Sequence, residues 1–136
     1  MEHLKTKVNY LIKRYETNDP YKLAALLGIQ VVHKQLGNTW GFYSKYFRIK
    51  TIHINEALGE EEQLFVCAHE LGHALQHCEV NTPFLKKNTL FSTERIEMEA
   101  NFFAIYLLFH DETLFEQITI DQALHKYGIS KRFIKK

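Results

Sequence analysis

Apolar side chains recur at helical spacing over the first 28 residues and predict two helices there. The first is expected from residue 3 to about residue 16, because its apolar positions lie three or four residues apart: Leu4, Val8, Leu11 and Ile12. Asp19 before Pro20 is typical of a helix cap followed by the first helical position. The second helix is therefore expected from Pro20 through Leu27, and Gly28 is expected to end it.

Three short segments rich in β-branched and aromatic residues follow and predict strands. They comprise residues 29–33, 40–44 and 51–55, and the last alternates apolar and polar side chains with the period of a strand. A turn is indicated at residues 37–39. From residue 60 onward, helical spacing predicts helices at about 60–78, 92–109 and 120–127, and a short piece from Ser130. A small sheet followed by helices indicates an α+β fold, in a single domain of residues 1–136.

Composition and charge are those of an ordinary globular protein. The 136 residues are 46% hydrophobic and 24% charged, and 17 basic against 16 acidic side chains leave a net charge of +1. This balance gives no overall field that would favour nucleic acid or a membrane surface. The longest apolar run, residues 102–109, is far shorter than the roughly 20 residues that a membrane helix needs.

The N-terminal segment and the cysteines predict a cytoplasmic protein. The chain opens on a charged, amphipathic stretch without the apolar core of a signal peptide. Cys67 and Cys78, if they lie on one helix, are about 16 Å apart, which is too far for a disulfide. Two unpaired thiols suit a reducing compartment.

The segment His69-Glu70-Leu71-Gly72-His73 predicts a zinc site on a helix. Histidines four residues apart share one helix face, and imidazole nitrogen is a common zinc ligand. Glu70, between them, is placed to act on a metal-bound water. We expect the opposite face of this helix to pack on a core, because its apolar side chains lie close to one direction: Leu64, Ala68, Leu71 and Leu75.

A catalytic zinc needs a third protein ligand, and two positions compete for this role. Glu79 follows soon after the zinc motif, but it requires a sharp turn with glycine at the position of Gln76. Glu97 on the next predicted helix is the better candidate. On that helix Glu99 points about 200° away, and Glu94 lies about 60° off and one turn earlier.

Asn101 strengthens the case for Glu97. The two residues are four apart, on a helix that is apolar nearly all round from Met98 to Phe109, so both are expected to be buried and to need partners. A metal-bound histidine usually donates its other ring N–H to an acceptor behind it. We therefore interpret Asn101 as the residue that orients His69.

Three segments of the chain closely resemble the ImmA/IrrE family of metallo-endopeptidases. They are Thr51-Ile52-His53-Ile54-Asn55, Ala68-His69-Glu70-Leu71-Gly72-His73-Ala74-Leu75 and Glu97-Met98-Glu99-Ala100-Asn101-Phe102-Phe103-Ala104, of which the last is more specific than the zinc motif alone. Residues 19–31 are similar as well, so the resemblance covers roughly residues 16–128. It implies a small zincin-like (gluzincin-like) metallopeptidase domain, in which a short sheet packs against the zinc-motif helix and a buried downstream helix.

The resemblance also implies a site and a biological role. Zn²⁺ would be held by His69, His73 and Glu97, with Glu70 as general base and Asn101 behind the ligands. Members of the family encoded by phages and integrative elements cleave a helix-turn-helix repressor, which makes such a protein the expected substrate and partner. Direct binding of nucleic acid or membrane is not expected.

Two other classes of function stand beside the peptidase. One is a repressor-binding or toxin–antitoxin-type module whose zinc site is structural. The other is a metal-free helical regulator, which would leave the buried Glu97 and Asn101 without a cause. Glu70 favours the enzyme, because a structural zinc site needs closed coordination and no base.

Three details of the site and surface stay open. The group that stabilises the oxyanion is one of four candidates, His77, His110, Tyr43 and His53, whereas Tyr106 lies about 180° from Glu97 on its helix. An extended substrate is expected to add a strand to the sheet, with residues 40–44 or 51–55 as its edge. The chain after Ser130 is too short for a DNA-recognition helix, so its basic residues indicate a solvated end.

Overall fold

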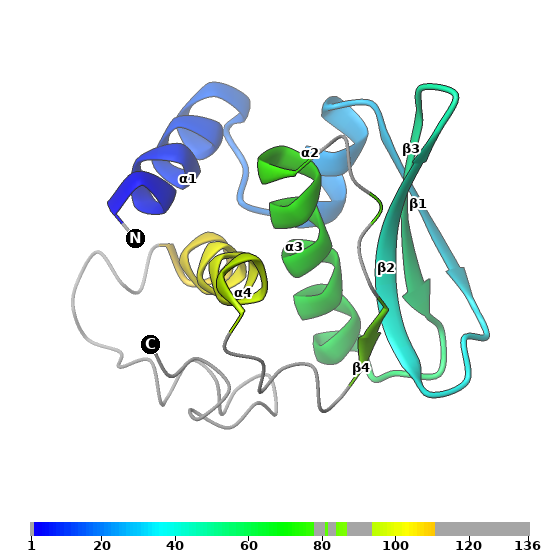
Figure 1. Ribbon diagram of the computed structural model, residues 1–136. Helices are drawn as coiled ribbons and strands as arrows, with labels where there is room; N and C mark the ends of the chain where they lie inside the picture. The colour runs from blue at the N-terminus through cyan, green and yellow to red at the C-terminus, as the bar shows by residue number, and fades with distance from the viewer. Residues whose placement is uncertain (1, 78–80, 82–83, 87–93, 111–136) are drawn as a thin grey trace.

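A computed structural model of the chain shows a sheet covered on one face by helices (Figure 1). It describes residues 2–77, 81, 84–86 and 94–110. The elements follow one another as α1 (Glu2–Tyr15), α2 (Pro20–Leu26), β1 (Ile29–Lys34), β2 (Thr39–Tyr46), β3 (Ile49–Asn55), α3 (Glu60–Gln76), β4 (Leu85–Lys86) and α4 (Arg95–Leu108). The predicted α+β class is confirmed. The helices predicted at 120–127 and from Ser130 lie outside the described residues.

The sheet is mixed, with the strand order β1-β3-β2-β4. β3 is central, paired in parallel with β1 and antiparallel with β2, and β4 adds an antiparallel strand to the outer side of β2. The predicted edge at residues 51–55 was therefore wrong, because β3 has β1 and β2 on its two sides. β4 pairs with β2 only at Thr39 and Gly41, so the alternative edge at residues 40–44 is covered only at its start and stays a prediction for the rest. β4 escaped sequence analysis because a strand of two residues has no period to detect.

The inner face of the sheet packs on α3. Tyr43 on β2 pairs with Ile52 on β3, and both side chains are fully buried. Gly41 lies where the sheet and α3 approach most tightly, since a Cβ at this position would stand 2.5 Å from Cγ1 of Val66. A side chain at residue 41 would therefore push the helix away from the sheet.

Helix α3 lies between the sheet and α4, with α1 packed on α4 in the outer layer (Figure 1). It was expected to bury one face and to present the other to a cleft. Instead, every residue from Phe65 to Ala74 is buried, because α4 covers the side that carries the histidines. The expected apolar residues Leu64 and Leu75 are only half-buried, near the two ends of the helix.

Long-range hydrogen bonds tie the N-terminal segment to the ends of α3 and α4. The Lys7 ammonium on α1 donates to the backbone carbonyl of Leu75, 3.2 Å away, in the last turn of α3. The Asn18 amide, between α1 and α2, donates to the carbonyl of Leu107 at 3.1 Å, in the last turn of α4. Both contacts satisfy carbonyls that a helix end leaves without an internal partner.

Two further features of the N-terminal half concern local backbone geometry. The α2 cap is as predicted, since Asp19 Oδ1 accepts from the N–H of Tyr21 at 2.9 Å and Pro20 stands at the first helical position. The β2–β3 hairpin closes through Phe47 and Arg48, which have φ angles of 52° and 77°. A residue other than glycine costs roughly 1–2 kcal/mol in this left-handed region. Among the described residues, no helix is long and apolar enough to cross a membrane.

Candidate metal centre

The close approach of α3 and α4 brings the predicted ligands together. Gly72 makes this approach possible, because a Cβ there would stand 3.1 Å from three side-chain atoms of Phe103 on α4. The missing side chain at Gly72 therefore lets α4 lie close against α3. Two residues of α3, His69 and His73, then face Glu97 in the first turn of α4.

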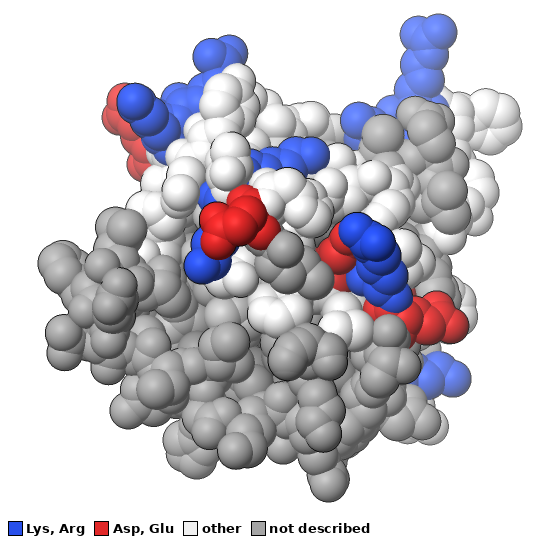
Figure 2. Space-filling view, turned by 60° about the vertical axis from the view of Figure 1, so that its left-hand side comes forward, with Lys and Arg blue, Asp and Glu red and all other residues white. Residues whose placement is uncertain are grey.

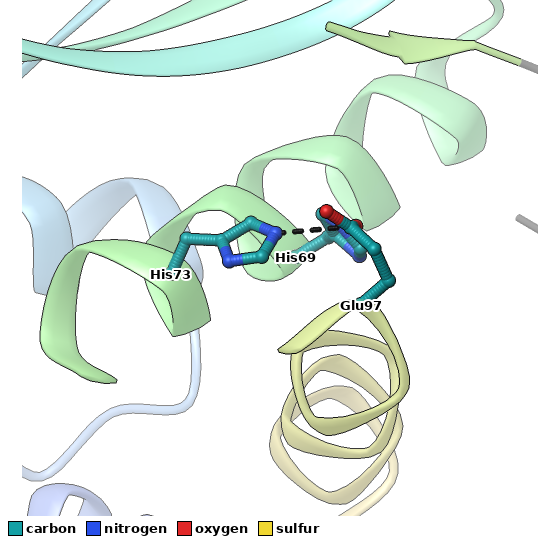
Figure 3. Close-up of side chains that lie close together, drawn as sticks. All are labelled: His69, His73 and Glu97. Atoms are coloured by element: carbon teal, nitrogen blue, oxygen red, sulfur yellow. Dashed lines mark hydrogen bonds and ion pairs between the residues drawn. The ribbon is translucent and has the colours of Figure 1, made fainter. Parts of the chain in front are cut away.

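Both histidines point their Nε2 atoms at one carboxylate oxygen (Figure 3). Oε1 of Glu97 lies 3.1 Å from Nε2 of His69 and 3.3 Å from Nε2 of His73. The two rings stand nearly edge to face, with centroids 4.9 Å apart. All three residues are buried, and one ligand atom from each lies within 4.8 Å of the others. The third ligand chosen from the sequence is therefore the acid that the fold brings to the two histidines.

The spacing of these atoms fits a single metal ion. In a tetrahedral zinc site with bonds of about 2.0–2.1 Å, neighbouring ligand atoms stand about 3.3 Å apart. The two nitrogen-to-oxygen distances, 3.1 and 3.3 Å, match this edge. A set of two imidazole nitrogens and one carboxylate oxygen is also the donor chemistry of a catalytic zinc site.

Asn101 fixes the state of one histidine ring. Its Oδ1 lies 2.8 Å from Nδ1 of His69, and both residues are buried. Because a carbonyl oxygen only accepts, the proton must be on Nδ1, and a neutral ring then has a lone pair at Nε2. That lone pair faces Oε1 of Glu97, and two lone pairs at this distance call for a cation between them. The position of Asn101 thus favours metal binding by His69.

The electrostatics of Glu97 agree with its place in the cluster. Burial by itself would raise the pKa of this carboxyl group. Without a metal, the protonated forms of His69 and His73 donate to Glu97, and their hydrogen bonds and charge outweigh burial and hold the pKa well below its ordinary value. With a metal bound, the cation takes the place of the Nε2 protons. Glu97 is therefore ionised at neutral pH. A carboxylate must be deprotonated to bind a metal.

The other acidic candidates lie elsewhere. Glu99 accepts from the Arg95 guanidinium at 3.0 Å, and its second oxygen is 3.8 Å from the ring of His77. Glu94 is the residue that caps α4. Glu79 lies outside the described residues. The pair formed by Arg95 and Glu99 has an i,i+4 spacing that sequence analysis could have noticed, and it explains why a second buried acid is tolerated so close to Glu97.

The candidates for oxyanion stabilisation separate by position. His53 lies on the other face of the sheet from α3, where its Nε2 is 2.9 Å from the Ser44 hydroxyl. His110 contacts Asn9 at 3.0 Å. The ring of His77 is 5.6 Å from that of His73. Burial and the neighbouring His73 lower the pKa of His77, so its ring is neutral at neutral pH.

Glu70 is the remaining residue of the motif. It is fully buried on α3, between the two histidines in sequence. Tyr106 lies away from the cluster, as its position on the helix predicted. Its ring stacks on Phe102 and lies under the Lys5 ammonium of α1.

Comparison with known proteins identifies the family. The model of the IrrE N-terminal-like domain, a peptidase family, matches residues 24–136. An uncharacterized immunity region protein 2 of Bacillus phage phi105 is 48% identical over 109 residues, which cover 79% of this chain and 69% of that protein. Metallopeptidase ImmA of Bacillus subtilis strain 168 is 33% identical over 132 residues, which cover 96% of this chain and 77% of that protein. No solved structure matches the chain significantly.

A helix with the His-Glu-x-x-His motif and a glutamate from the next helix define the zincin-like class of metallopeptidases. The sequence matches identify the family within this class. The chain belongs to the ImmA/IrrE family of metallopeptidases, as the resemblance of its motifs indicated.

Proposed function

We propose that this protein is a cytoplasmic zinc-dependent endopeptidase that cleaves a helix-turn-helix repressor at a specific site. The observation that carries the enzymatic part is the convergence of His69, His73 and Glu97 with Asn101 behind His69. Similarity to an immunity region protein of a phage supports the regulatory part. Cleavage would inactivate the repressor and so relieve the repression of a phage or mobile element.

In this proposal, His69, His73 and Glu97 hold zinc, and Asn101 keeps the His69 lone pair directed at the ion. When bound, zinc supplies a Lewis acid that activates water and polarises a carbonyl group. The Glu70 carboxylate accepts the proton of the attacking water and passes it to the nitrogen of the leaving amine. Glu70 is fully buried on α3 between the two histidines in sequence, which supports this role by keeping it within the same motif.

The alternative is a repressor-binding or toxin–antitoxin-type module with a structural zinc. A structural site closes four protein ligands around the metal, whereas the described residues bring three to this cluster. Three ligands leave a fourth position for water, and the buried Glu70 lies in the same motif as two of them, which together favour hydrolysis.

Replacing Glu70 with glutamine separates the two functions. Glu70→Gln is expected to keep zinc content, fold and repressor binding, but to abolish cleavage, because an amide cannot accept the proton. General acid–base catalysis contributes about 10²–10⁴ in rate. The test incubates wild type or variant with purified helix-turn-helix repressors and examines fragments by mass spectrometry. Equal relief of repression by both proteins without any fragment would replace the enzyme with the binding module.

A further inference from the structure

The turn between β2 and β3 carries a patch that the metal centre does not use. We name residues 45–50 the hairpin tip. Its sequence, Lys45-Tyr46-Phe47-Arg48-Ile49-Lys50, combines three cations with three large apolar side chains and contains no acid. The exposed fractions are 61% for Tyr46, 96% for Phe47 and 54% for Ile49. The hairpin tip therefore presents apolar surface to solvent beside the exposed Arg48 and the half-buried Lys45 and Lys50.

The backbone of the hairpin tip adopts a strained conformation that destabilises the fold. Tyr46 pairs with Ile49, so the turn consists of Phe47 and Arg48 alone. Both have positive φ, where a two-residue hairpin turn strongly prefers Asn-Gly. The fold gains almost no burial from Phe47 in return. Strained conformations of this kind concentrate at functional positions.

The hairpin tip lies toward the end of the molecule at which α3 ends (Figure 1). Gly41 stands beside Val66 on α3. From Gly41, β2 extends about 20 Å to Phe47. From Val66, α3 extends about 10 Å toward the same end of the molecule to reach His73. The hairpin tip is thus on the order of 10 Å beyond the metal ligands along this direction. It is separate from the metal centre, yet one folded protein bound at the centre would reach it.

We propose that the hairpin tip is an exosite, a second binding surface that captures the folded protein substrate away from the cleavage site. Phe47 inserts into an apolar pocket of the substrate, and Arg48 and Lys50 meet carboxylates around that pocket. The inference rests on the proposed function for the identity of the partner. Aromatic residues and arginine are enriched among the residues that dominate binding energy in interfaces. A hairpin already fixed in one conformation loses little freedom on binding.

The chemistry favours a protein partner over nucleic acid. Non-specific binding to DNA draws on many phosphate contacts, about six to ten in strong cases, and the hairpin tip offers three cations. On the face seen in Figure 2, the coloured basic and acidic side chains are interspersed and form no continuous basic stripe. A solvent-exposed phenylalanine at the centre of the tip calls for an apolar pocket, which a folded protein provides.

The binding test uses the Glu70→Gln background, so that bound substrate is not cut. Its probe is a purified, folded helix-turn-helix repressor, and affinity is measured by calorimetry at 50 and 300 mM NaCl. Phe47→Ala is expected to weaken binding at least 20-fold, and Arg48→Ala about 5-fold, with a smaller loss for Arg48→Ala at high salt because screening removes its contribution. Tyr10→Ala is the matched control, since Tyr10 is 61% exposed on α1; it should bind like its parent.

A second variant separates binding from stability. Phe47→Asn combined with Arg48→Gly supplies the residues that the turn prefers, so its melting temperature should rise or stay equal while repressor binding is lost. A variant that is more stable yet does not bind identifies a role outside the fold. If it binds as tightly as its parent, the exosite does not exist.

Cleavage then distinguishes the exosite from the proposed function. With the catalytic glutamate restored, variants of the hairpin tip should cut a short peptide spanning the cleavage site normally, and folded repressor with a raised KM. Unchanged KM for folded repressor overturns the exosite and leaves the peptidase standing. Lost binding without any cleavage by wild type supports the exosite and refutes the peptidase. If wild type does not bind the repressor, the proposal is overturned. The same variants are also titrated with a 20-base-pair DNA duplex, and a loss of affinity for the duplex alone likewise overturns the proposal.

Discussion

Replacing Asn101 with leucine should weaken zinc binding by removing the acceptor behind His69. Leucine has nearly the shape of asparagine, so the packing of α4 changes little, but the Nδ1–H of His69 loses the oxygen 2.8 Å away. In the metal-free protein the ring can shift its proton to the other nitrogen and avoid the loss. With zinc on Nε2 the proton must remain on Nδ1, buried and unpaired.

The cost therefore falls on the zinc-bound state. An unpaired buried donor costs about 1–3 kcal/mol, and each 1.4 kcal/mol is about a tenfold change in affinity. Asn101→Leu should thus bind zinc roughly 10–100-fold more weakly, the range usual for partners behind metal ligands. Competition with a chelator of known affinity measures this difference. Asn101→Asp, which retains an acceptor, is the control and should bind at least as well as wild type. A folded Asn101→Leu protein within threefold of wild type would refute the assigned role.

Three other predictions address the third ligand, the sheet and alkaline stability. Glu97→Gln should lower zinc content well below one ion per chain while Glu99→Gln retains it, as elemental analysis can show; the reverse result would move the third ligand to Glu99. Gly41→Ala should lower the free energy of unfolding by about 1–3 kcal/mol in urea titration, because its methyl group collides with α3. Gly59→Ala should cost less, because its methyl group meets only Glu62 Oε1, at 3.9 Å; equal losses would contradict the close packing of sheet and helix. Burial, aided by nearby acidic groups, raises the pKa of Tyr21 to about 12. Because the unfolded phenol loses its proton first, near pH 10, stability should fall between about pH 10 and 12, and a Tyr21→Phe protein that loses stability just as steeply would disprove this.

Sequence reasoning found the residues of the candidate metal centre because each of them obeys a local rule. His69 and His73 are four residues apart on one helix, and so are Glu97 and Asn101, and a helix converts this spacing into a shared face. A buried acid and a buried amide without a nearby partner then require one across the helix interface. The structure supplies that partner at hydrogen-bond distance.

The same local rules could not predict which strands pair with one another or which helices pack together. Residue content, with alternation in residues 51–55, identified three strands, but neither contains information on their order, so β3 was mistaken for a possible edge although it is central. Periodicity also assigned one buried face to α3, since it cannot reveal that α4 covers the other side at Gly72. These errors have one cause. Both features depend on which elements pack together, and the local sequence pattern contains no information about such packing.

The hydrogen bonds from Lys7 and Asn18 bear on where this catalytic unit can be cut. The family match begins at residue 24, after both residues, yet α1 buries Leu4 and Val8 against the helical layer. A gene fusion or truncated protein that started at the family boundary would uncover an apolar side of α4 and leave two helix ends without their donors. A domain exchanged between members of this family would therefore fold only if α1 were transferred together with α3 and α4.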